Sequence, residues 1–312
     1  GVFPAFSAGW VLSKEDFLSS SNVISLLKLR ASWGKTGNAE IGNFASRDLW
    51  NAASYKQLPA IEPVQPESPN LTWEKSSQTD IGLDFGVFNN RVSGEIDFYN
   101  KKTNGLLFYQ NIPYTSGYSN IYRNIGDMKN TGFEMVINTQ NIKKDNFTWD
   151  TNFNVAKNNN EITALPDDNR DQIIGNVIRR VGERLDSFSL VEYAGVDPNN
   201  GDALFYKNTL NPDGTLDKTK TNDYSEAQRI IAGSSTPDWI AGLTNTVEYK
   251  NFDFSFTFYG EFGGNLYNSG GKFMSTSASN GYDNQTVDQM NRWQNPGDIT
   301  NVPQARLGKG NG

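Results

Sequence analysis

The chain has 312 residues, a net charge of −7 and 36% hydrophobic residues, and it contains neither cysteine nor histidine. These absences exclude disulfide frameworks, Ser–His and Cys–His nucleophile pairs and ordinary zinc sites. The acidic balance without a basic patch argues against nucleic acid as a partner, and no apolar run is long enough for a transmembrane helix.

Long strands with alternating side chains dominate the pattern. In TDIGLDFGVF (79–88), apolar residues at 81, 83, 85 and 87 face one way and polar or small residues face the other, as in a half-buried strand. We expect nine strands, the last of them a weaker start that would prolong the eighth: 1–10, 24–36, 71–88, 91–103, 131–140, 147–158, 236–249, 252–262 and 263–268.

The connections between these strands fall into two length classes. Asn89-Asn90, 141–146 and Lys250-Asn251 are short, and 11–23 is intermediate, whereas 37–70, 104–130, 159–235 and the segment from 263 onward are long. If the chain runs up and down, every short connection lies at one end of the sheet and every long one at the other. Transmembrane barrels have this segregation, with short periplasmic turns and long extracellular loops.

The two faces of the strands differ as the faces of a membrane barrel do. One face carries bulky apolar side chains such as Leu29, Met135 and Phe254, and the other carries Lys28, Asn152 and Ser255. The sequence therefore predicts an all-β protein, an antiparallel transmembrane β-barrel segment. Because nine strands would leave two open edges, we expect the segment to be a piece of a larger barrel.

Several sequence blocks are more specific than the alternation. In chain order they are GVFPAFSAGWVLSKEDF, ISLLKLRASWGKTGN, PNLTWEKSSQTDIGLDFGVFNNRVSGEIDFYNKKTNGLL, IGDMKNTGFEMVINT, YAGVDPNNGDALFY and GSSTPDWIAGLTNTVEYKNFDFSF. Together they resemble the SusC/RagA family of TonB-dependent outer-membrane transporters of Bacteroidota, over nearly the whole chain.

The resemblance implies more than the pattern shows. It implies a barrel of roughly 22 strands, with residues 1–312 as a partial barrel domain from its C-terminal part and with the plug domain and remaining strands absent from this chain. The partners it implies are a SusD-like surface lipoprotein that acts as a lid, the TonB-ExbB-ExbD complex acting through the missing N-terminal part, and the lipid bilayer. The cargo it implies is an oligosaccharide or a peptide, imported through the cell outer membrane.

Aromatic residues in the long connections are the candidate substrate-binding residues. An aromatic ring suits the apolar face of a pyranose, and arginine supplies a planar hydrogen-bond fork. The alternative is that these side chains pack the loops against the wall or the lid. The candidates are Tyr109, Tyr114, Tyr118, Tyr122, Arg123, Trp50, Tyr282 and Trp293.

Two polar sets have competing interpretations. Asp197, Asn199 and Asp202 have the spacing of a calcium loop, but a Pro-Asn-Asn-Gly turn explains the same residues and no distal Glu is present. Charged residues on the polar face are expected to form cross-strand ion pairs or to contact the plug, with a substrate path as the alternative; they are Lys28, Arg30, Glu95, Asp97, Glu134 and Asp150. The sequence predicts no cofactor.

The function predicted is TonB-dependent import without bond chemistry, so we expect no enzyme activity. The first alternative is a soluble or surface-attached β-rich module that binds glycans. The second is a glycoside hydrolase, which would need an acid and a base in one cleft, and nothing local in the sequence selects such a pair.

Overall fold

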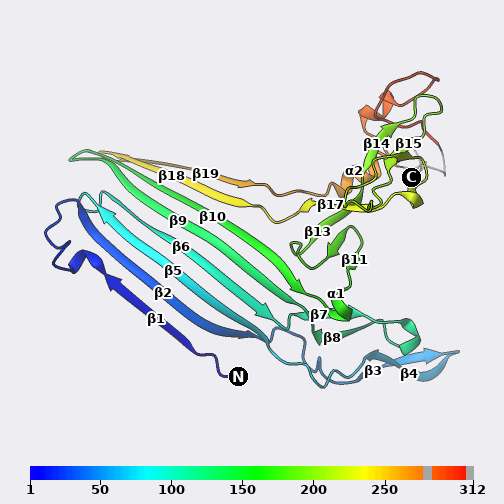
Figure 1. Ribbon diagram of the computed structural model, residues 1–312, viewed down its shortest axis with the longest axis horizontal. Coiled ribbons are helices and arrows are strands. Elements are labelled where there is room, and N and C mark those ends of the chain that lie inside the picture. Colours follow the sequence, from blue (N-terminus) through cyan, green and yellow to red (C-terminus); the bar gives the residue numbers. More distant parts are fainter. Residues whose placement is uncertain (277–282, 307–312) are drawn as a thin grey trace. The chain divides into compact units, whose positions relative to one another are not determined.

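The chain folds into two units in a computed structural model that describes residues 1–276 and 283–306 (Figure 1). The first unit comprises residues 1–172, 179–185 and 236–263. The second comprises residues 173–178, 186–235 and 264–312.

The first unit is built on one antiparallel sheet of eight strands, in the order β1-β2-β5-β6-β9-β10-β18-β19. The strands are β1 (Ala5–Val11), β2 (Ile24–Asn38), β5 (Glu74–Val87), β6 (Val92–Asn104), β9 (Asp127–Lys144), β10 (Phe147–Ala164), β18 (Trp239–Tyr249) and β19 (Phe252–Phe262). All eight occupy predicted segments. The predicted strand at 263–268 is wrong, because Gly263 turns into the left-handed region (φ 83°) and ends the extended run.

The loops of this sheet are segregated by length as predicted, with the tight turns together at one end (Figure 1). The β18–β19 turn is the two-residue Lys250-Asn251 turn expected. The β5–β6 turn has four residues, 88–91, because Val87 pairs with Val92 and φ is positive at Phe88, Asn89 and Asn90. The β9–β10 turn contains only residues 145–146, whereas the sequence predicted a connection over 141–146. The strand pairing continues to Lys144 and Phe147, because backbone hydrogen bonds form there whether or not the side chains are apolar.

The sheet has one apolar face, and that face is open rather than covered. Leu29, Leu83, Ile96, Met135 and Val155 pair in one row across five strands. Around this row lie apolar side chains that are more than half exposed, such as Phe6, Ile81, Phe98, Phe254 and Phe258. A broad exposed apolar surface of this kind is the feature that the lipid-facing side of a transmembrane barrel wall requires.

The buried apolar residues of the first unit lie away from the exposed apolar face, at the end of the sheet where the long connections begin. Leu106, Ile121, Ile162 and Leu165 are all at least nine-tenths buried. The long connections of this unit contain two hairpins: β3 (Leu49–Tyr55) pairs with β4 (Leu58–Gln65), and β7 (Leu107–Asn111) pairs with β8 (Asn120–Asn124). The four buried residues lie in or next to β10 and the β7–β8 hairpin. The short helices of this unit are η1 (Leu12–Lys14), η2 (Tyr114–Ser116) and α1 (Pro166–Asn169).

The sequence did not predict these hairpins and treated both segments as loops. The β3–β4 turn has positive φ at Lys56 (50°) and Gln57 (66°), as a type I′ turn requires. Asn and Gly are the residues that normally mark such a turn, so Lys-Gln gave no signal.

The second unit also contains strands where one long loop was expected between 159 and 235. It holds a four-stranded sheet of β11 (Gln172–Ile174), β12 (Val177–Arg179), β13 (Ser187–Val191) and β17 (Arg229–Ser234). The terminal residues Gln172 and Arg179 of this sheet are assigned to the first unit. A three-stranded sheet comprises β14 (Tyr193–Val196), β15 (Ala203–Tyr206) and β16 (Lys220–Thr221). Its helices are η3 (Tyr224–Glu226), α2 (Ser269–Met274) and η4 (Val287–Asn291), and Ala203, Phe205 and Ala227 form its small core.

Candidate functional site

The face of the sheet opposite the apolar face, here called the polar face, carries charged and amide side chains. Arg30, Gly82, Asp97 and Glu134 occupy one row across β2, β5, β6 and β9. Toward β10 and β18 the same face is mostly neutral, with a hollow lined by amide and hydroxyl residues such as Asn138, Asn152 and Thr244, together with Asp150. The polar face therefore has a charged part on β2–β9 and a mostly neutral amide and hydroxyl part on β9–β18.

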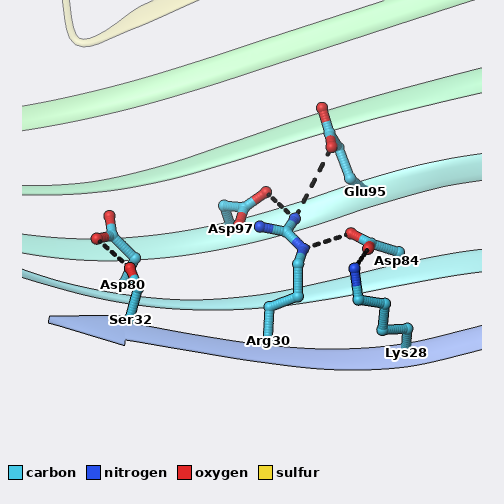
Figure 2. Close-up of polar contacts among 7 residues, drawn as sticks. All are labelled: Lys28, Arg30, Ser32, Asp80, Asp84, Glu95 and Asp97. Carbon is cyan, nitrogen blue, oxygen red and sulfur yellow. Dashed lines mark hydrogen bonds and ion pairs between the residues drawn. The ribbon is translucent and has the colours of Figure 1, made fainter. Parts of the chain in front are cut away.

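Arg30 is the centre of the charged part (Figure 2). Its Nε donates to Asp84 Oδ1 at 2.6 Å and its Nη2 donates to Asp97 Oδ2 at 3.0 Å, with Glu95 3.8 Å from Nη2. Lys28 adds a longer ion pair of 3.4 Å to Asp84. One guanidinium thus links three neighbouring strands, and the cross-strand ion pairs predicted for Lys28, Arg30, Glu95 and Asp97 are present.

Gly82 makes this arrangement possible. It lies between Arg30 and Asp97 in the row, and any Cβ at this position would overlap both the Asp97 carboxylate and the Arg30 guanidinium. The missing side chain lets the guanidinium cross β5 and reach β6. The sequence showed Gly82 only as a small residue on the polar side, so the link from β2 to β6 was not predicted.

The remaining carboxylates of the charged part lie around an open hollow of about 390 Å³. Asp80 accepts hydrogen bonds from Ser32 (3.0 Å) and Gln78 (2.7 Å). Glu134 and Tyr99 also line the hollow. Asp150 lies instead in the neutral part of the polar face.

Asp48 joins two of the predicted aromatic residues, although the sequence analysis did not select it. The Trp50 indole donates to Asp48 Oδ2 and the Tyr118 hydroxyl donates to Asp48 Oδ1, both at 2.9 Å. The hydrogen bond to Asp48 raises the pKa of the Tyr118 phenol. Residues 70 positions apart in the sequence are thereby brought together, which no local sequence pattern signals.

The other candidates of this unit lie on the β7–β8 hairpin. Tyr109 and Tyr122 are cross-strand partners whose rings meet edge to face at 4.2 Å. Arg123 donates to Gln110 at 3.3 Å. Tyr114, in η2, is 85% exposed. The hairpin therefore presents Tyr114 to solvent, whereas Tyr109 and Tyr122 pack against each other.

The candidates of the second unit are placed differently. The Trp293 indole donates to the Pro198 carbonyl at 3.0 Å, and its ring packs against Gly201. Trp293 therefore covers the 197–202 turn. Tyr282 lies outside the described residues.

The calcium candidates Asp197, Asn199 and Asp202 belong to that turn. Asp197 Oδ1 accepts from the Asn199 backbone and side-chain amides at 2.9 and 3.0 Å. Asp202 forms an ion pair of 2.6 Å with Arg306 and accepts a hydrogen bond from Asn222. Within residues 1–276 and 283–306, no group of three His, Cys, Asp or Glu residues has an arrangement that would hold a metal ion.

Acidification is expected to loosen the 197–202 turn. Burial acts to raise the pKa of Asp202, but hydrogen bonds from Asn222 and Arg306 together hold it below its usual value. The stabilisation is therefore present above the unfolded-state pKa of about 3.9 and is lost as the pH falls through the folded-state value. The protection factors of the 197–206 amides against hydrogen exchange should fall below about pH 4. In Arg306→Gln this acid-dependent step should shrink, and an unchanged step would contradict the assignment to the Asp202–Arg306 pair.

None of the helices in the described part of the chain has the length and apolar character needed to cross a membrane. The eight-stranded sheet, with an exposed apolar face, a polar face and loops segregated by length, is the wall of a transmembrane β-barrel. The family model "TonB dependent receptor-like, beta-barrel" matches residues 1–284. The chain belongs to the TonB-dependent receptor β-barrel family, and the predicted fold class and family are confirmed.

The chain is similar in sequence to TonB-dependent receptors of Bacteroidota. It is 34% identical to TonB-dependent receptor P3 of Formosa agariphila over 96% of this chain and 32% of that protein. It is 36% identical to TonB-dependent receptor SusC of Bacteroides thetaiotaomicron over 82% of this chain and 27% of that protein. The chain thus spans between about a quarter and a third of the length of these relatives.

Solved structures agree with this placement. The structure of the RagAB peptide transporter superposes with a TM-score of 0.89 at 30% identity, over 99% of this chain and 34% of that one. The "open-open" state of the RagAB peptide importer gives a TM-score of 0.85 at 29% identity, with the same coverage.

Proposed function

We propose that the chain is part of the barrel of a TonB-dependent outer-membrane importer, and that its function is gated passage rather than bond chemistry. One observation carries the proposal: a single sheet has an exposed apolar face, a polar face and long loops gathered at one end. This combination suits a wall with lipid outside and a hydrated path inside. The relatives named SusC and P3, and the likeness to RagAB, support the same class.

The whole protein in this proposal is larger than residues 1–312. It has a plug domain and further strands, it couples to TonB-ExbB-ExbD, and a SusD-like lipoprotein covers the loop end as a lid. The cargo is an oligosaccharide, with a peptide as the alternative, since RagAB is named a peptide transporter. The chain covers 34% of that neighbour, which leaves room for these additional parts.

Energy-dependent uptake by cells that carry the full-length protein tests the proposal. Cells with and without its gene would be given fluorescent hexasaccharides and fluorescent pentapeptides, each with and without a protonophore. We expect one probe to accumulate only in cells that have the gene and only without the protonophore. Recovery of the full-length protein from the soluble fraction, without detergent, would contradict the proposal and favour a soluble glycan-binding module.

A further inference from the structure

Two long connections of the first unit are held together as one polar and aromatic surface. The segment before β5 and the β7–β8 hairpin are joined by the Ser68 hydroxyl, which donates to the Tyr122 carbonyl at 2.7 Å. Asn124 accepts from the Thr72 amide at 2.7 Å and donates to the Thr72 carbonyl at 2.8 Å. Ser68 is 7% exposed. These contacts fix the two segments relative to each other before any ligand arrives.

Asp48 sets the orientation of two aromatic rings on this surface. The Trp50 N–H and the Tyr118 O–H both point at its carboxylate, one at each oxygen. A ring whose polar atom is fixed at one point keeps its faces for apolar contact, and Trp50 is 52% exposed. Because the rings are positioned in advance, binding a ligand would cost little side-chain entropy.

The Asp48 carboxylate retains hydrogen-bonding capacity. An ionised carboxylate offers about four lone-pair sites, and Trp50 and Tyr118 each occupy one. Asp48 is itself exposed. Its remaining acceptor sites therefore suit a ligand that brings several donors close together at the edge of the indole.

We propose that Asp48, Trp50 and Tyr118 form a saccharide-binding subsite at the loop end of the barrel. In this subsite the C–H face of a pyranose lies on the Trp50 indole, and neighbouring hydroxyls donate to Asp48. The inference rests on the proposed function and assigns the saccharide, rather than the peptide, to this surface.

The chemistry of the surface fits a pyranose better than it fits a peptide backbone. A pyranose has an apolar face and adjacent hydroxyl donors on one rigid ring, so it satisfies the indole and the carboxylate together. An extended peptide presents successive backbone N–H groups in opposite directions. It therefore cannot place two neighbouring backbone donors on Asp48 while keeping a flat face on Trp50.

Binding by the full-length protein, purified in detergent from its own outer membrane with its co-purifying partners, tests the subsite. The probes are maltohexaose, cellohexaose, xylohexaose and mannohexaose, with a mixture of pentapeptides as the competing class, measured by calorimetry. We expect at least one hexasaccharide to bind, Trp50→Ala to weaken it at least tenfold, and Asp48→Asn to weaken it several-fold. Trp50→Phe, which retains a ring, should lose less than Trp50→Ala.

Tyr55→Ala is the matched control. Tyr55 is an aromatic residue at the other end of the same hairpin, is 67% exposed, and has the Lys56 ammonium 5.7 Å from its ring centre. The Tyr55→Ala variant should bind the saccharide with the affinity of the unmutated protein. An unchanged melting temperature of the Trp50 variant would separate lost binding from lost folding.

Three results would overturn the subsite: equal affinities for Trp50→Ala and Tyr55→Ala, binding of pentapeptides alone, or no saccharide binding by the unmutated protein. Each leaves the proposed function separately testable. Cells that still accumulate a probe in an energy-dependent way would retain the importer and lose only this site.

Discussion

Val155→Lys is expected to impair the stable insertion of the full-length barrel. Val155 lies in the middle of β10, in the same row as Leu83 and Met135, with its side chain on the apolar face. A lysine on the lipid face near the bilayer midplane costs roughly 2–4 kcal/mol. The yield of folded barrel in the outer-membrane fraction, measured against total expressed protein, should fall severalfold.

Asn154→Lys is the matched control, because residue 154 is the next position on the same strand and points to the opposite face. Asn154 is exposed on the polar face, where it pairs with Gly242 and Val136. The same charge there should leave the yield close to that of the unmutated protein. Equal losses for the two variants would show that the apolar face does not meet lipid.

Arg30→Ala should lower the stability of the barrel more than any other single truncation of a charged side chain on the polar face. Without the guanidinium, Asp84 lies directly opposite Glu95 and diagonal to Asp97, and Lys28 is the remaining cation. Removing one partner of a buried pair costs about 3–5 kcal/mol. Since the Arg30 side chain is 33% exposed, we expect about 2–3 kcal/mol after solvent screening.

The measurement is the melting temperature of the full-length protein in detergent, compared with two other variants. Lys28→Ala should cost under about 1 kcal/mol, because a single partly exposed ion pair contributes little. Arg30→Lys should be intermediate, since an ammonium keeps the charge but cannot reach Asp84 and Asp97 with a rigid fork. If Arg30→Ala melts together with Lys28→Ala, the three-strand link does not stabilise the wall.

The aromatic candidates show how far sequence reasoning reached within the site. It selected Trp50 and Tyr118 because ring-bearing residues in long loops suit a sugar face, and the structure brings these two together. It did not select Asp48, which carries no motif and becomes important only because both side chains donate to it. It also proposed Trp293, whose indole donates to Pro198. Whether an aromatic side chain in a loop is exposed or packed depends on contacts with residues far away in the sequence.

The sequence by itself determined the eight strands of the large sheet, their two faces and the segregation of their loops. These properties are local: successive side chains of a strand alternate, so a period of two at 79–88 fixes which residues share a face wherever the strand pairs. The same holds for the Lys250-Asn251 turn, whose length follows from the two strands that flank it.

Only the tertiary structure decided which strands meet and which side chains touch. β2 pairs with β5 across a connection that contains a hairpin of its own, and the register of that pairing sets Arg30 opposite Gly82 and within reach of Asp84 and Asp97. The Asp48 contacts likewise join segments 70 residues apart. Such pairings depend on long-range registers and loop closures, because alternation along one strand carries no information about the strand beside it.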